Sequence, residues 1–200
     1  MEIISKALFG IANSLLIPDV ILLILFFFRA LIMIGGTYNN YMTRRKASRL
    51  FDDKIKNLTA DGVEELRQLV PGRPDSLFTK YLSDLLSREK SEDYADYMLT
   101  RFETEAAKDI NTSQLLTKLG PVLGLIGTLI SMSPALVGLS TGDISGMAYN
   151  MQVVFASTVV GLLISAVGLA TGQLKQRWYA KDLNNLDYVS RVINDKKEDR

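Results

Sequence analysis

Two threonines lie near the middle of two long apolar stretches of this sequence. Thr128 belongs to an uncharged run from Leu119 to Gly142, and Thr158 belongs to a second one from Ile144 to Leu174. A hydroxyl in an apolar helix can bond back to its own turn and have no further role. Two hydroxyls at similar depth could instead line a narrow polar path, where they would bond a carboxylate or a passing ion. The residues alone leave both alternatives open.

Small and hydroxyl residues recur around both threonines at intervals of three and four. This spacing places them on one stripe of each helix. Such stripes usually let two membrane helices pack closely, although they could also support a pore. The first set is Thr117, Gly120, Pro121, Gly124, Gly127, Thr128 and Ser131, and the second is Ser157, Thr158, Gly161, Ser165, Gly168 and Gly172.

Both apolar runs are longer than the roughly 20 residues that a helix needs to cross the hydrocarbon of a membrane. They predict transmembrane helices at 115–140 and 148–174, joined by an extracytoplasmic turn at 141–147. A third apolar stretch predicts a first span at 18–42, which Arg29 interrupts. A charge there costs roughly 2.5 kcal/mol or more. Arg29 could reach toward an interface, form an ion pair with a carboxylate of a neighbouring chain, or indicate that the span is shifted so that Arg29 lies nearer the cytoplasmic side. A role in an ion path is the alternative to these structural roles.

Basic residues follow the first and third predicted spans, whereas the link after the second offers only Asp143. By the positive-inside rule, the N-terminus and that link lie outside and both basic clusters lie in the cytoplasm. We therefore expect an outer interfacial helix at 1–17, or a plain extension of the first span. A cytoplasmic helical region at 43–114 and a cytoplasmic C-terminal helix and tail at 175–200 complete an all-α integral membrane protein.

Helix caps and chain breakers divide the cytoplasmic part. Thr59 or Asp61 would cap a short helix in NLTADGVEELRQL, and LFTKYLSDLL predicts another. Ser91, followed by acidic residues, would cap a helix that continues without a breaker into the second span. The third span should likewise continue into a long cytoplasmic helix.

Composition excludes several kinds of chemistry. The chain has no cysteine and no histidine, so it lacks disulfides, a thiol nucleophile, an ordinary zinc site and an imidazole base. A net charge of +1 gives no indication of a nucleic-acid partner. We expect no enzyme activity, no metal and no cofactor. The second and third spans also lack acids, so a proton relay through them would need a carboxylate from another polypeptide.

Two segments resemble the MotA/TolQ/ExbB proton-channel family. They are LLTKLGPVLGLIGTLISM, with its proline and L-G-T pattern, and VVFASTVVGLLISAVGLA, with its A-T-x-x-G-L core. The resemblance implies a ring-forming homo-oligomer, thought to be a pentamer, around a dimer of a one-span MotB/TolR/ExbD-type partner that brings an aspartate. By position, it implies that Thr128 and Thr158 face that aspartate and that Pro121 lies at the cytoplasmic mouth.

The resemblance is closer to ExbB and TolQ than to flagellar MotA, whose usual length this chain lacks. Val153, with Gln152 beside it, stands where ExbB and TolQ members commonly have a glutamate. The resemblance implies that the chain is a subunit of an ion channel, for protons, in the inner membrane. This channel would belong to an energising complex that the ion-motive force drives. The alternative is a structural membrane oligomer that scaffolds partners without conducting ions.

Overall fold

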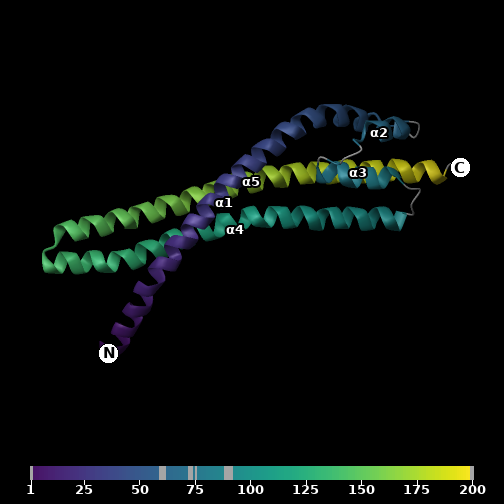
Figure 1. The fold of residues 1–200 in the computed structure, drawn as a ribbon. Coiled ribbons are helices and arrows are strands. Elements are labelled where there is room, and N and C mark those ends of the chain that lie inside the picture. Colours follow the sequence, from purple (N-terminus) through teal and green to yellow (C-terminus); the bar gives the residue numbers. More distant parts are fainter. Residues whose placement is uncertain (1, 59–61, 72–73, 75, 88–91, 199–200) are drawn as a thin grey trace. The chain divides into compact units, whose positions relative to one another are not determined.

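The computed structural model describes residues 2–58, 62–71, 74, 76–87 and 92–198, and within these ranges its regular structure is entirely helical (Figure 1). The helices are α1 (Glu2–Lys56), α2 (Val63–Leu69), α3 (Leu77–Ser87), α4 (Glu92–Thr141) and α5 (Ile144–Glu198). The predicted all-α class is confirmed for the described residues.

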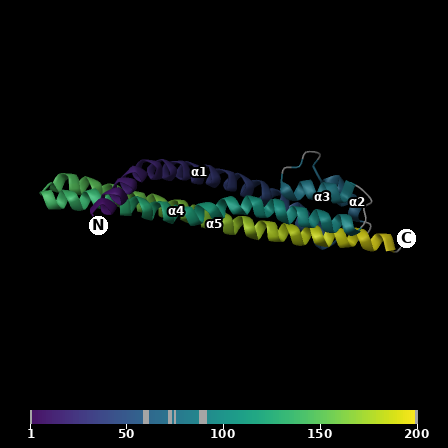
Figure 2. The ribbon, with the colours of Figure 1, turned by 90° about the horizontal axis from the view of Figure 1, so that it is seen from below.

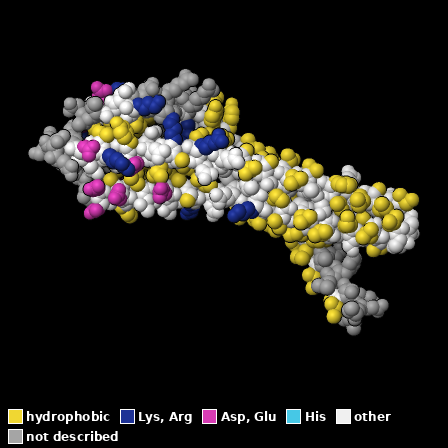
Figure 3. All heavy atoms as spheres, turned by 180° about the vertical axis from the view of Figure 1, so that it is seen from behind, with side chains coloured by type: hydrophobic (Ala, Val, Ile, Leu, Met, Phe, Trp, Pro, Cys, Tyr) yellow, Lys and Arg dark blue, Asp and Glu magenta, His cyan; other side chains and the backbone are white. Residues whose placement is uncertain are grey.

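Three of these helices are long and apolar enough to cross a membrane, as the sequence predicts. The candidate spans lie within Ser14–Arg44, Glu92–Thr141 and Ile144–Asp195. At most 39% of the most apolar window of any of them is buried within the chain, so most of their surface is left for lipid or for other chains. Hydrophobic side chains cover this part of the molecule, whereas charged ones gather elsewhere (Figure 3).

The first compact unit comprises residues 1–36 and 112–172. Within it, α4 and α5 run antiparallel and side by side, and α1 crosses them (Figures 1 and 2). Leu23 and Ala30 of α1 pack there against Leu116 and Leu123 of α4 and against Ile164 of α5. The buried side of α1 thus repeats at helical spacing, as expected for a helix that packs along one face.

The second compact unit comprises residues 37–111 and 173–200. Its apolar core includes Tyr81 and Leu82 of α3, Phe102 of α4, and Leu186 and Val189 of α5. An amphipathic pattern explains these helices, because each buries one apolar face and leaves most of its charged side chains toward water. The same unit holds ion pairs between Arg44 and Asp182, at 2.6 Å, and between Lys175 and Asp109, at 2.9 Å.

A tight turn joins α4 to α5. Of the predicted turn region 141–147, only Gly142 and Asp143 lie outside the helices. Gly142 has φ +78°, a left-handed conformation that glycine adopts without strain. The Asp143 carboxylate then accepts a hydrogen bond from the amide of Gly146, at 2.9 Å, and so caps the start of α5.

The helical continuity that the sequence predicts is present. α4 passes through Pro121 and Pro134 without ending, and α5 continues to Glu198. α1 already includes the residues before the first span, and their position relative to a membrane stays a prediction. α2 and α3 correspond to the two predicted short helices, while the predicted caps Thr59, Asp61 and Ser91 lie outside the described residues.

Candidate functional site

Glycines bring the backbones of α4 and α5 into direct contact. A Cβ atom on Gly120 would lie 2.5 Å from the carbonyl oxygen of Gly161, and one on Gly124 would lie 3.1 Å from the carbonyl oxygen of Ser157. Gly168 meets the backbone of α4 in the same way. These glycines therefore pack two helices of one chain, since any larger side chain would push the backbones apart.

Hydroxyl groups add hydrogen bonds along the same interface. Ser165 Oγ donates to the carbonyl oxygen of Thr117, at 2.9 Å, and so joins α5 to α4. Ser113 Oγ donates to Met33 Sδ of α1, at 3.4 Å. Thr171 Oγ1 donates to the carbonyl oxygen of Val167, at 2.7 Å, and lies 3.1 Å from the same sulfur. Sequence reasoning missed this sulfur contact, because a methionine in an apolar span carries no distinguishing pattern.

Thr128 and Thr158 lie within about one helical turn of each other on this helix pair. A Cβ atom on Gly124, one turn before Thr128, would lie 3.3 Å from the Cα atom of Thr158. Thr128 Oγ1 donates to the carbonyl oxygen of Leu125, at 2.7 Å, and Thr158 Oγ1 donates to that of Val154, at 3.2 Å. Both side chains thus bond to their own helix, and both residues are half-buried.

The remaining predicted site residues divide between buried and exposed positions. Ser131 and Ser157 are buried, and Pro121 is half-buried within α4. Gln152 is exposed and Val153, which replaces the glutamate of the resembled family, is half-buried. Over the described part of the chain, no group of three or more acidic, histidine or cysteine side chains could hold a metal ion.

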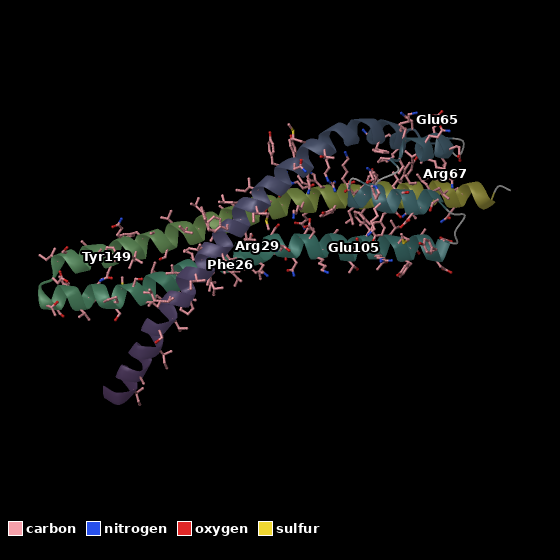
Figure 4. The ribbon with its side chains drawn as sticks, in the orientation of Figure 1. Phe26, Arg29, Glu65, Arg67, Glu105 and Tyr149 are labelled. Carbon is pink, nitrogen blue, oxygen red and sulfur yellow. The ribbon has the colours of Figure 1, made fainter. Side chains whose placement is uncertain are left out.

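Arg29 lies on the exposed side of α1 (Figure 4). No ion pair joins it to any side chain among the described residues of its own chain. The predicted pairing with a carboxylate of a neighbouring chain therefore stays a prediction, and the exposed position leaves the guanidinium within reach of one.

Asp19 is a residue of the first span that sequence reasoning missed. It is 5% exposed, and neither carboxylate oxygen has a hydrogen-bond partner in the described structure. Its helical spacing could have revealed it, because Asp19, Leu23 and Ala30 are spaced so that all three lie on the buried face of α1.

Over the described residues, the fold and this interface define an all-helical membrane protein with three candidate spans. The apolar runs of α4 and α5, 119–141 and 144–174, pack closely and contain no acid. A family model described as the MotA/TolQ/ExbB proton channel family matches residues 53–187. This match covers more than half of the chain, and the chain belongs to that family. Among individually curated proteins, no sequence matches it.

Proposed function

We propose that copies of this chain form an ion-conducting ring around a dimer of a one-span partner of the MotB/TolR/ExbD type. The ring, a pentamer on the family pattern, would sit in the cytoplasmic membrane with its N-termini outside. Protons would pass at the partner's aspartate, and their flow would drive an ExbB- or TolQ-like energising machine. Membership of a proton-channel family and the three candidate spans support this proposal.

The observation that best supports this proposed function is the placement of Thr128 and Thr158. Each hydroxyl donates its proton to a backbone carbonyl, which leaves the oxygen lone pairs free to accept a hydrogen bond. A protonated aspartic acid is a donor that could use them. A deprotonated one could draw the same O–H groups toward itself, since a charged acceptor makes the stronger bond.

The glycine contacts fix the level of these two hydroxyls. Gly120 and Gly124 of α4 leave no space between themselves and α5, so the two helices cannot slide or separate easily. The two threonine hydroxyls are then held within about one turn of each other, where a partner's carboxyl group could reach both. This arrangement would give the partner's carboxyl group a fixed hydrogen-bonding position.

The test replaces the hydroxyls by methyl groups of the same shape. Thr128→Val and Thr158→Val should each lower proton flux about tenfold or more in vesicles that contain the chain and its partner, because a hydrogen bond to a charged group contributes about 1.5–3 kcal/mol. Thr141→Val is the matched control, since Thr141 makes the same kind of bond to its own helix at the end of α4. Full flux in both variants would exclude this role.

A structural membrane oligomer is the second candidate function. The observation in its favour is that both threonine hydroxyls are already satisfied within their own helices. It requires no partner with an intramembrane aspartate. A neighbouring reading frame for a short protein, with one span near its N-terminus and an aspartate early in that span, would favour conduction, and activity without any such protein would favour the scaffold.

A further inference from the structure

Asp19 is a buried carboxyl group within the membrane-spanning unit. It lies in the first candidate span, Ser14–Arg44, directly after Pro18, which α1 accommodates. Its buried position on the packed face of α1 separates it from Arg29 on the exposed face. The span precedes residues 53–187, so the family match neither includes this residue nor assigns it a role.

The carboxylate fits against both of the other helices. A Cβ atom on Gly127 would lie 2.9 Å from Asp19 Oδ2 and 3.0 Å from Ser157 Oγ, so the acid and the hydroxyl approach one point on α4. Ser157 Oγ donates to the carbonyl oxygen of Val154, at 2.9 Å, which leaves its oxygen able to accept. Gly127 thus provides the space that the carboxyl group occupies.

The neighbouring helices offer no charge to balance this acid. On α4 the charged residue closest in sequence to Gly127 is Lys118, the turn after α4 holds Asp143, and α5 has no charged residue before Lys175. Lys118 is about 13 Å from Gly127 along the helix axis at 1.5 Å per residue. The one tyrosine of the apolar run of α5, Tyr149, is 68% exposed and lies near the start of that helix (Figure 4).

A buried carboxylate without a partner is costly, so a cation must neutralise it whenever the site is closed to water. Gly127 and Ser157, which meet Asp19, are the sequence neighbours of Thr128 and Thr158. We propose that Asp19 is a proton-binding site of this chain, level with the two threonines, which loads and releases a proton during conduction. The loading and release of a proton during conduction rests on the proposed function, whereas the proton-binding site at Asp19 does not.

The choice of a proton over a metal cation follows from the ligands. A metal cation gives up its hydration shell only where several oxygens replace it. Among the described contacts, the oxygens near Gly127 are those of the Asp19 carboxyl group and the hydroxyl of Ser157, and neither carboxyl oxygen has a hydrogen-bond partner. A proton needs one oxygen, so this site suffices for it.

Carbodiimide labelling tests the site in the full-length chain in native membranes. The apolar reagent dicyclohexylcarbodiimide reacts with a protonated carboxyl in an apolar site, and rearrangement gives a stable N-acylurea that mass spectrometry of peptides locates. We expect the adduct at Asp19, forming about tenfold more slowly for each pH unit above the midpoint of titration. A water-soluble carbodiimide should label the exposed Asp143 and leave Asp19 unmodified.

Two variants sharpen the test. Gly127→Ala places a methyl group where the carboxylate lies and should reduce the labelling of Asp19 severalfold, whereas Gly10→Ala, with nothing within 4 Å, should leave it unchanged. Absence of the adduct from the wild-type chain, or a rate independent of pH, would overturn the proposal. Protection by sodium but not by potassium at constant pH would overturn the assignment to a proton.

The labelling experiment tests the binding site and the flux experiment tests the proposed function, so the two proposals can fail independently. If Asp19 is labelled as expected but the chain shows no proton flux, the binding site stands and the proposed conduction is refuted. If proton flux persists in Asp19→Asn and the wild-type chain forms no adduct, the proposed conduction stands and the binding site is refuted.

Discussion

Replacing Gly120 by alanine tests the close packing of α4 and α5 directly. The new methyl carbon would lie 2.5 Å from the carbonyl oxygen of Gly161 and 2.9 Å from the amide nitrogen of Ser165. Both neighbours are backbone atoms, so no change of side-chain rotamer can relieve the contact. The helices must move apart, and overpacking of this kind costs about 1–3 kcal/mol.

Gly35→Ala is the matched control. Gly35 also lies inside a helix of the same unit, and a Cβ atom there would meet nothing within 4 Å. Both variants gain the same roughly 0.5–1 kcal/mol of helix propensity. The difference in stability between them therefore isolates the contact itself, about 1–3 kcal/mol in favour of Gly35→Ala.

Thermal unfolding of the two variants in one detergent, followed by circular dichroism, measures that difference. For a chain of this size 1 kcal/mol corresponds to a shift of about 2–4 °C, so Gly120→Ala should unfold about 2–12 °C below Gly35→Ala. Equal midpoints, or a higher one for Gly120→Ala, would show that the backbones of α4 and α5 are not in contact at Gly161.

Three further outcomes are expected. Ser165→Ala removes the bond to the carbonyl oxygen of Thr117 and should cost about 0.6 kcal/mol, measured by the same unfolding experiment. Asp109→Asn leaves the ammonium group of Lys175, an 8% exposed residue, without its carboxylate and should cost about 1–3 kcal/mol, whereas Lys175→Met should cost less because it leaves no buried charge. Burial raises the pKa of Tyr81 to about 12, so the folded state holds a proton that the unfolded state loses above about 10. Stability should therefore fall as pH rises from 10 toward 12. Tyr81→Phe should reduce this fall and remove one tyrosine from the alkaline absorbance titration, whereas Tyr179, whose pKa is also raised by burial, should still contribute to both.

The three candidate spans could be predicted because long, mainly apolar runs leave a helix as the ordinary way to satisfy the backbone in lipid. The small-residue stripes could be predicted for the same geometric reason, since intervals of three and four select one face. Their partner could not, because spacing does not distinguish a helix of the same chain from one of a neighbour. The contact between Gly120 and Gly161 shows that α4 and α5 of one chain meet there.

Asp19 shows where hydropathy reaches its limit. A single carboxyl barely changes the average of a long apolar window, so the span is found and the acid within it is overlooked. The contact with Gly127 also depends on the angle at which α1 crosses α4, and helical periodicity carries no information about that angle. The alternative roles of Thr128 and Thr158 are similar in kind, because their bonds to their own helices fit both a pore and a plain membrane helix.

The turn at Gly142 and Asp143 has a consequence for recognition. Two residues between helices leave no loop that could reach into the space beyond the membrane. In the proposed topology, a folded protein outside the membrane would meet at this turn only the tips of α4 and α5, whose last threonine hydroxyl and carboxylate are already bonded to their own backbone. On that topology, we expect α4 and α5 to act on a chain inserted alongside the spans rather than on one that docks at this turn.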